Sequence, residues 1–237
     1  MTTNPAQSAD AAVSPFRSPS LWLRAAGSLV FRLGCYAAMV WMALLAEARP
    51  APSLPDFVLP HVPLVPFIER YNYWLWIVSY VPVALWLFTA APERFIRYMV
   101  SAGLLGLLRG ACILATGLGA VSGVDRHAGM SDETRWAAFW SLGTPWGLFN
   151  PDAGMRVYLT KDLFFSGHTA TTLLLLLYVW PWPKVRWAML ALHLLVVASV
   201  FLAHLHYTID IIGAYAITFS LFALREWNVR GLLSSKA

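Results

Sequence analysis

The segment RWAMLALHLLVVASVFLAHLHYTIDIIGAYAITFSLFALRE, residues 186–226, contains two apolar runs that are separated by almost nothing. A bilayer core about 30 Å thick is crossed by about 20 apolar residues of α-helix. The runs at 186–205 and 207–226 therefore predict two membrane-spanning helices joined by a very short turn. The same criterion applied along the chain adds four predicted spans, at 26–46, 72–91, 97–121 and 163–182.

The composition supports a membrane protein with several spans. Of the 237 residues, 59% are hydrophobic and 12% are charged, and the mean hydropathy of +0.60 is well above that of a soluble domain. The formal net charge of +5 comes from basic residues between the apolar runs, where they face lipid head groups, so nucleic-acid binding is not indicated. Cys35 and Cys112 lie in apolar runs without metal-ligand or redox spacing, and we interpret them as small buried side chains.

The positions of Lys and Arg predict the orientation of the spans. Both short connections on one side, at 93–97 and 184–186, are basic, and short basic loops face the cytoplasm. We therefore expect an all-α membrane protein, a six-transmembrane-helix bundle with both termini inside (N-in/C-in). Short tails and minimal loops favour a bacterial inner membrane.

The chain is predicted to form one domain with two tails. Residues 1–20, rich in Ala, Ser and Thr, predict a disordered cytoplasmic tail; 21–226 form the six-helix transmembrane catalytic domain, and 227–237 form a second cytoplasmic tail. Arg24 and Arg32 lie about two turns apart, which suggests an interfacial lead-in at 21–32 before the first span proper.

The outer loop at about 122–161 is too long for a plain connection. Ser131, a residue type that caps helix N-termini, precedes two acidic residues and then Arg135, Trp136, Phe139, Trp140 and Leu142. This pattern predicts a capped amphipathic helix in the membrane interface, with Trp side chains at head-group level.

Two polar clusters lie at the outer ends of the predicted spans. The first, KDLFFSGHT at 161–169, lies where the outer loop enters the fourth span, and the second, HLHYTID at 204–210, lies at the junction of the last two. Charged side chains at a hydrocarbon boundary are costly unless they have partners or water. Because the predicted topology brings both clusters to the same face, we expect them to form one site.

The spacing of four between His206 and Asp210 puts both on one side of a helix, a turn apart. A carboxylate that accepts the imidazole N–H fixes the tautomer and leaves the other ring nitrogen free as a nucleophile. A histidine attacking phosphorus forms a phosphohistidine, and a second, protonated histidine must then protonate the departing oxygen, a role that we assign to His168. Neither step needs a metal or a cofactor.

Arg109 is the charged residue inside the third predicted span, flanked by Gly106 and Gly110. A guanidinium binds two phosphate oxygens at once and keeps its proton, which suits a phosphate site; the alternative is a snorkelling or bundle-pairing arginine. His193 lies inside the fifth span without an acidic neighbour, and we expect it to pack within the bundle.

Four segments together resemble the sphingomyelin synthase family, the lipid-phosphotransferase branch of the type 2 phosphatidic acid phosphatase superfamily. Ser53-Leu54-Pro55-Asp56 is similar to that family's proline-leucine-proline-aspartate motif, and Arg109 lies as the arginine of its third span does. The stretches at 162–169 and 203–210 are similar to its serine-glycine-histidine-threonine and histidine-tyrosine-threonine-x-aspartate signatures. The resemblance covers about residues 52 to 226.

The resemblance implies a catalytic triad of His168, His206 and Asp210 on the exoplasmic or periplasmic face. It also implies transfer of phosphocholine or phosphoethanolamine from a glycerophospholipid to ceramide or another lipid alcohol, with release of diacylglycerol. Its partners are then the phospholipid donor, the acceptor and the membrane, and self-association into a homo-oligomer stays open. Around the triad we expect the substrate phosphate to contact Arg109, Lys161, Asp162, Ser166, Gly167, His204 and Tyr207.

The chain departs from that family at Thr160-Lys161 and at Thr116-Gly117-Leu118-Gly119, so the donor and the acceptor stay open. One alternative is a lipid phosphate phosphatase or phospholipase C-like hydrolase that uses water as acceptor. Val200 stands where ordinary phosphatases of the superfamily have arginine, which favours transfer. A transporter or proton relay would use the same Arg and His residues, but it predicts Gly/Pro-interrupted helices in matched halves, which the sequence does not show.

Overall fold

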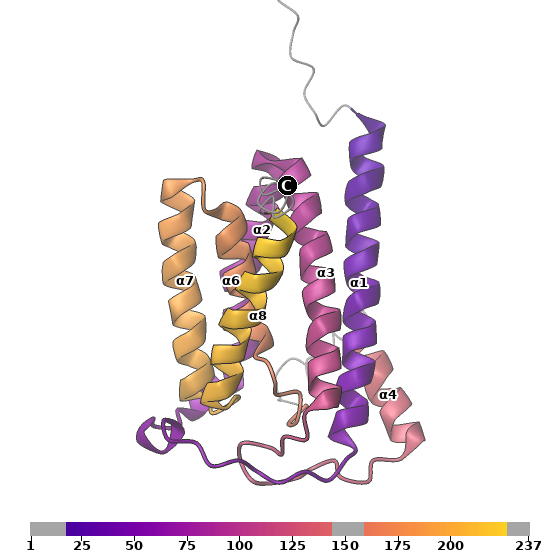
Figure 1. The fold of residues 1–237 in the computed structure, drawn as a ribbon, viewed down its shortest axis with the longest axis vertical. Coiled ribbons are helices and arrows are strands. Elements are labelled where there is room, and N and C mark those ends of the chain that lie inside the picture. Colours follow the sequence, from indigo (N-terminus) through magenta and orange to yellow (C-terminus); the bar gives the residue numbers. More distant parts are fainter. Residues whose placement is uncertain (1–17, 144–158, 227–237) are drawn as a thin grey trace, which may run out of the picture.

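The computed structural model describes residues 18–143 and 159–226, and every regular element in these ranges is helical. The elements are α1 (Pro19–Glu47), the 3-10 turn η2 (Leu59–His61), α2 (Pro66–Ala90), α3 (Pro92–Ala115), α4 (Asp132–Gly143), α6 (Gly167–Val179), α7 (Pro183–Leu202) and α8 (Thr208–Glu226). Figure 1 shows the long helices running side by side, with the first described helix beginning at the upper end.

Five of these helices, α1, α2, α3, α7 and α8, are long and apolar enough to cross a membrane. The predicted span at 163–182 corresponds to α6, which is apolar but only 13 residues long. It is short because the residues before Gly167 are not helical: they form a loop whose carbonyl groups bind a side chain of α3. The predicted span at 97–121 likewise ends early, at Ala115, where the chain becomes extended at Thr116.

The residues of the predicted interfacial lead-in, 21–32, belong to the same helix as the first predicted span. Helix α1 is continuous over 29 residues, because nothing between Pro19 and Glu47 interrupts its backbone hydrogen bonding. Arg32 therefore lies near the middle of a long apolar helix. The predicted N-terminal tail falls mostly on residues 1–17, outside the described part, as do the tail at 227–237 and the portion 144–158 of the outer loop.

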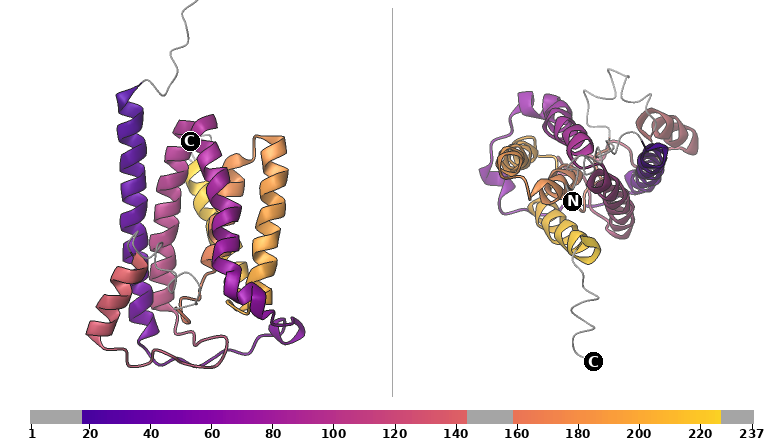
Figure 2. Two further views of the ribbon diagram at one scale, coloured as in Figure 1. Left: turned by 180° about the vertical axis from the view of Figure 1, so that it is seen from behind. Right: turned by 90° about the horizontal axis from the view of Figure 1, so that it is seen from above.

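Helix α6 is the centre of the bundle. It contacts α2, α3, α7 and α8, and the view from above shows these helices around it, with α1 on the far side of α3 (Figure 2). Leu174, Leu175 and Tyr178 of α6 are buried with Tyr98 and Leu87 in the largest core cluster. A helix that is apolar all round, as α6 is, requires burial on every side.

Helices α1 and α3 pack closely because α3 carries glycine at their contact. A Cβ at Gly110 would lie 3.1 Å from the backbone of Met39 and 2.3 Å from the end of Met42. Helix α4 attaches to the lower half of α1, where Trp41 contacts Trp136 and Phe139 at ring-centroid distances of 4.5 and 5.6 Å. The predicted cap of α4 is present: the Ser131 hydroxyl accepts the Thr134 N–H at 3.2 Å.

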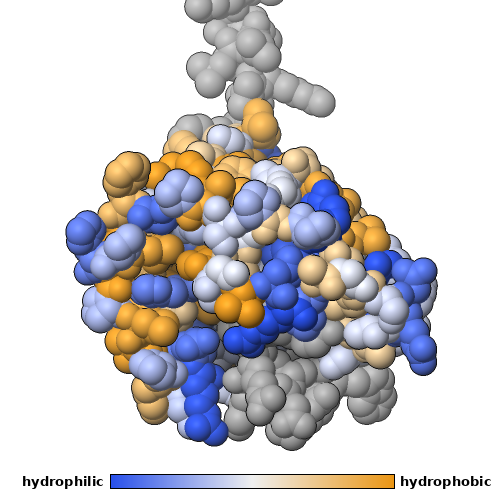
Figure 3. Space-filling model, turned by 90° about the horizontal axis from the view of Figure 1, so that it is seen from below, coloured by the Kyte–Doolittle hydropathy of each residue, from blue (hydrophilic) through white to orange (hydrophobic). Residues whose placement is uncertain are grey.

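The loops that carry the polar clusters gather at the lower end of the bundle (Figure 1). Seen from below, hydrophilic residues collect near the middle of this face (Figure 3). On the sides of the bundle, in contrast, large apolar side chains such as Val30, Val78, Leu85 and Leu194 are exposed. Exposed apolar flanks with a polar end are what a bilayer requires of a bundle that spans it.

Candidate active site

The two polar clusters meet at the lower end of the bundle. The Ser166 N–H donates to the carbonyl of Asp210 at 3.1 Å, which ties the loop before α6 to the first turn of α8. Gly213, one turn further along α8, lies so near this loop that a Cβ there would be 2.6 Å from the Phe164 ring. Residues more than 40 positions apart therefore form one site.

His206 and Asp210 form a buried pair. The Nδ1 of His206 lies 3.2 Å from Oδ2 of Asp210, the contact that their spacing predicts. The same Oδ2 accepts the Tyr207 N–H at 3.0 Å. His206 is 3% exposed and Asp210 is 0% exposed. The carboxylate thus contacts Nδ1 through one oxygen, while its other oxygen, Oδ1 of Asp210, has no partner among the described residues.

His168 occupies the first turn of α6, which begins at a cap formed by Ser166: its hydroxyl accepts the Thr169 N–H at 3.5 Å. The imidazole packs edge-on against Trp76 of α2, with ring centroids 5.1 Å apart. Its Nε2 is buried and has no hydrogen-bond partner among the described residues. His206 and Arg109 are near enough to act electrostatically on this ring.

Arg109 of α3 reaches the loop that forms the first polar cluster. Its Nε donates to the Phe165 carbonyl at 2.7 Å, and its Nη2 binds both the carbonyl and the carboxylate of Asp162, the latter at 2.9 Å. A Cβ at Gly167 would lie 3.1 Å from the Arg109 Nε, so the guanidinium passes directly beside the Ser166-Gly167-His168 backbone. Arg109 thus both shapes the loop and brings a positive charge to the site.

Asp56 fixes the start of α8. One carboxylate oxygen accepts the Thr208 N–H at 2.7 Å, and the other accepts the Thr208 hydroxyl at 2.9 Å and the N–H groups of Val58 and Leu59 at 2.8 and 3.1 Å. Burial alone would raise the pKa of Asp56, but the hydrogen bonds from these backbone groups and the Thr208 hydroxyl hold it below its usual range. In the sequence, Asp56 is the aspartate of a segment that resembles a family motif. Only the structure shows that it caps α8, the helix that carries Asp210.

The segment that holds α6, α7 and α8 also matches a known family. Residues 161–227 match the model described as PAP2 superfamily C-terminal. This part of the chain is a PAP2 superfamily C-terminal domain. Members of the superfamily are typically enzymes that act on phosphorylated lipids. A search of curated proteins finds no match to the chain.

The match covers His168, His206 and Asp210 but not Arg109 or Asp56. Helix α3 and the loop after α1 therefore supply two residues that shape the site from outside the matched segment, and Trp76 of α2 is a third. Trp76 was missed by sequence reasoning. Its signal is the spacing Tyr73, Trp76, Tyr80, which puts three large rings on one face of α2.

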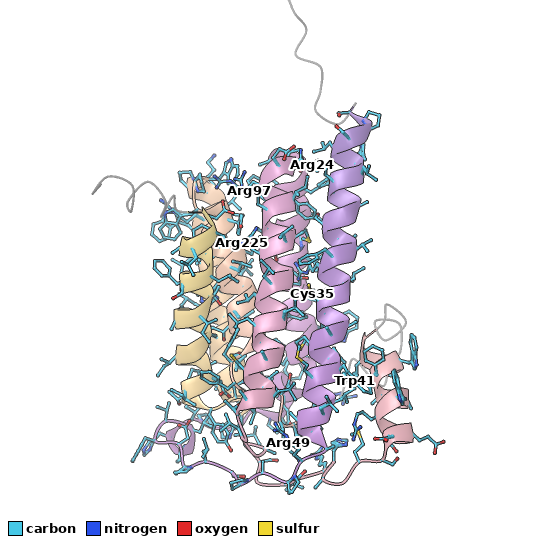
Figure 4. The ribbon with its side chains drawn as sticks, turned by 45° about the vertical axis from the view of Figure 1, so that its right-hand side comes forward. Arg24, Cys35, Trp41, Arg49, Arg97 and Arg225 are labelled. Carbon is cyan, nitrogen blue, oxygen red and sulfur yellow. The ribbon has the colours of Figure 1, made fainter. Side chains whose placement is uncertain are left out.

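Lys161 lies at the edge of the PAP2 domain with its ammonium fully engaged. The Nζ lies 2.8 Å from the Glu47 carbonyl, 2.6 Å from the Arg49 carbonyl and 2.6 Å from Oδ1 of Asp125. An ammonium has three donors, so a phosphate contact would require the release of one of these partners. The hydrogen bond from Lys161 holds the pKa of Asp125 below its usual range. Arg49, just beyond the end of α1, is labelled at the lower end of the bundle in Figure 4.

Tyr207 and His204, which we expected at the phosphate, bind backbone groups. The Tyr207 hydroxyl donates toward the Gly119 carbonyl at 2.9 Å and accepts the Leu54 N–H at 3.0 Å. His204, whose φ of 49° is in the left-handed region, places Nε2 2.9 Å from the Val62 carbonyl. Both residues therefore tie the turn between α7 and α8 to the loops around it.

The remaining histidine within the bundle is satisfied as predicted. His193 of α7 is buried, with Nδ1 2.8 Å from the Thr172 hydroxyl and Nε2 2.7 Å from the Tyr215 hydroxyl. It thus joins α6, α7 and α8 and has no nitrogen left for a substrate. Within the described ranges, no three His, Cys, Asp or Glu side chains gather where they could hold a metal ion.

Proposed function

We propose that the protein is an integral membrane enzyme that transfers a phosphorylated head group, phosphocholine or phosphoethanolamine, between lipids through a phosphohistidine on His206. The observation that carries the proposal is the buried Nδ1···Oδ2 contact of His206 with Asp210, within electrostatic range of a second imidazole, His168, whose Nε2 has no hydrogen-bond partner in the part of the chain that the structure describes. Two imidazoles and a carboxylate are the groups that this reaction needs.

In the first half-reaction, Nε2 of His206 attacks the donor phosphorus, and the bond from phosphorus to the diacylglycerol oxygen breaks. His168, as imidazolium, gives its proton to that oxygen, and the negative charge of the bound phosphate favours this protonated form. Asp210 stabilises the positive charge that develops on His206, and Arg109 offers the remaining N–H groups of its guanidinium to the phosphate. The products are diacylglycerol and phosphohistidine.

In the second half-reaction, the hydroxyl of an acceptor lipid attacks the phosphohistidine and gives its proton to His168. The bond from phosphorus to Nε2 breaks, which restores neutral His206 and regenerates the imidazolium of His168. Ceramide is the acceptor that the resemblance to the sphingomyelin synthase family favours, while water in the same place would make the enzyme a hydrolase. Membership of the C-terminal segment in the PAP2 superfamily is compatible with either acceptor.

We further propose a six-span topology with both termini in the cytoplasm and the site on the exoplasmic face. The support is the charge at the two ends: Arg24, Arg97 and Arg225 all lie at the upper end, opposite the site (Figure 4). Helix α6 counts as the sixth span because it occupies the centre of the bundle, with its non-helical entrance buried in protein rather than exposed to lipid.

The deciding experiment follows labelled head groups. Purified protein is incubated with phosphatidylcholine, phosphatidylethanolamine and phosphatidate, each with and without ceramide. Label on ceramide supports the transferase, label in free phosphocholine or phosphate supports the hydrolase, and turnover that persists in His206→Ala excludes this mechanism. An acid-labile, base-stable label on the protein that vanishes in His206→Ala would report the phosphohistidine directly.

A further inference from the structure

Arg32 lies deep in the bundle, where none of the carboxylates that the structure describes pairs with it. It is the fourteenth residue of the 29-residue helix α1, about 20 Å along the helix from either end. Cys35, three residues further along, marks this middle level in Figure 4. Because a lone charge at this depth is unfavourable, it needs an explanation.

Its present partners are weak ones. One Nη donates to the Tyr80 hydroxyl at 3.0 Å and the other approaches the Met99 sulfur at 3.7 Å, while the guanidinium lies 5.6 Å from the ring centres of Tyr80 and Tyr98. Within residues 18–143 and 159–226, no Asp or Glu forms an ion pair with Arg32, whereas Arg109 in the same bundle pairs with Asp162. A guanidinium has five donors, so Arg32 keeps unused hydrogen-bonding capacity.

A continuous set of side chains connects Arg32 to the triad. On α2, Tyr80 stacks on Trp76 with centroids 5.1 Å apart, and Trp76 contacts His168 at the same distance. On α1, Met39 touches the Arg109 guanidinium at 3.3 Å, and Arg32 is seven residues, or about 10 Å, further from the site.

Several side chains on the α2 side of this set, and Arg32 itself, are only partly buried. Arg32, Tyr73, Trp76, Tyr80 and His168 are all partly exposed rather than buried. Helix α1 packs mainly on α3 and α4, while α2 packs on α3, α6 and α7. Arg32 of α1 reaches across to α2 through its hydrogen bond to the Tyr80 hydroxyl.

The donor groups of Arg32 and Tyr80 indicate what kind of group they bind. Arg32 and Tyr80 offer N–H and O–H donors, so they select a group with acceptor oxygens. This group must lie deeper in the membrane than the phosphate at His206. In a membrane lipid, the acyl ester or amide carbonyls are the acceptors that lie below the head-group phosphate.

We propose that Arg32, with the hydroxyl of Tyr80, binds an acyl carbonyl of the lipid whose phosphate lies at His206. The inference rests on the proposed function and extends it: the site recognises ester- or amide-linked lipids by a contact about two helical turns along α1 from Met39, the residue that touches Arg109. Arg32 is then a specificity residue: it distinguishes lipids whose chains are attached through a carbonyl from lipids whose chains are not. It does not act on phosphorus.

The test compares an ester-linked diacyl donor with its ether-linked dialkyl analogue, which has the same head group and chain length but no carbonyls. Both are presented in mixed micelles at equal surface concentration. We expect wild type to use the ester donor with at least tenfold higher kcat/KM. Arg32→Gln and Tyr80→Phe should each lower kcat/KM on the ester donor by about tenfold and leave it nearly unchanged on the ether donor. Arg24→Gln, on the same helix but paired with Glu93 at the exposed end, is the matched control and should change neither value.

Equal losses on both donors, or an unchanged ester-to-ether ratio, would overturn the inference. If Arg32→Gln fails to elute as a monodisperse protein, Arg32→Lys and Tyr80→Phe decide, because Phe keeps the ring on Trp76 and removes only the hydroxyl. Failure of the proposed function looks different: wild type would then turn over neither donor, or His206→Ala would be as active as wild type.

Discussion

The two ends of the helix bundle both contain buried polar side chains, but they use them differently. At the upper end, the Tyr178 hydroxyl lies 2.8 Å from Ser101 Oγ and donates to Glu226 at 2.6 Å, while Arg225 and Arg97 bind Ser101 and Glu226 at 2.7 and 3.2 Å. Within this network donors and acceptors satisfy one another, although Nε of Arg186, in the first turn of α7, is buried without a partner among the described residues. At the lower end, Nε2 of His168 and Oδ1 of Asp210 are buried and unpartnered among the described residues.

This difference separates stability from function. A saturated network joins α3, α6 and α8 and has little left to offer a ligand, whereas unpartnered buried groups carry a free-energy cost that a bound substrate can remove. We therefore expect substitutions at the lower end to affect turnover first, and substitutions at the upper end to affect stability first.

The largest expected effect is at the imidazoles. His206→Ala and His168→Ala should each reduce turnover by about 10⁴-fold or more, because each removes a group that makes or breaks a bond. Elution volume and thermal stability in detergent check that the variants are folded. If a His168→Ala, His206→Ala double variant still turns over lipid, the lower end of the bundle is not the catalytic end.

Asp210→Asn should reduce kcat by about 10³-fold while it preserves the shape of the site, because an amide neither stabilises the imidazolium nor enforces the tautomer that leaves Nε2 free. Single-turnover measurement of diacylglycerol release separates this chemical step from product release. A loss seen only in KM would assign Asp210 to substrate binding instead.

Arg109→Gln should weaken use of the phosphorylated donor by about 100-fold, because it removes the positive charge at the site. It should also lower the melting temperature, because Arg109 binds the carbonyl groups of Asp162 and Phe165. Arg109→Lys keeps the charge and serves as the comparison. If both variants lose stability but keep kcat/KM, Arg109 is a structural residue of the loop.

Tyr178→Phe at the upper end should leave kcat/KM within about twofold of wild type and lower the free energy of unfolding by about 1–3 kcal/mol, because Ser101 and Glu226 lose a partner in a buried network. Denaturant titration in detergent measures the stability. A large loss of activity without a loss of stability would show that the two ends are coupled.

The smallest expected effect is the pH dependence at Asp56. Its folded-state pKa lies below the unfolded value of about 3.9, so its contribution to stability is present above that value and is lost as the pH falls through the folded-state pKa. Between pH 5 and pH 3, the melting temperature of wild type should therefore fall more steeply than that of Asp56→Asn. Glu133→Gln, an exposed carboxylate on α4, should leave the slope unchanged.

Local patterns made several features predictable. Runs of apolar residues identify helices because hydrocarbon leaves backbone groups no partner but each other. The His206–Asp210 contact follows from helical periodicity, which puts residues four apart on one face. The short α6 and the unbroken α1 were not predictable in this way, because charge and length alone do not show where a helix packs.

By itself, then, the sequence determined that the chain is helical and apolar enough for a membrane, and which histidines and carboxylates could share one end of it. Only the tertiary structure decided that Asp56 caps α8, that Lys161 is held by Glu47, Arg49 and Asp125, and that Arg32, in the middle of the bundle, binds a tyrosine hydroxyl and no carboxylate of the described residues. The reason is physical: periodicity is set by neighbours along the chain, whereas a side chain's partners are set by packing between helices that are distant in sequence.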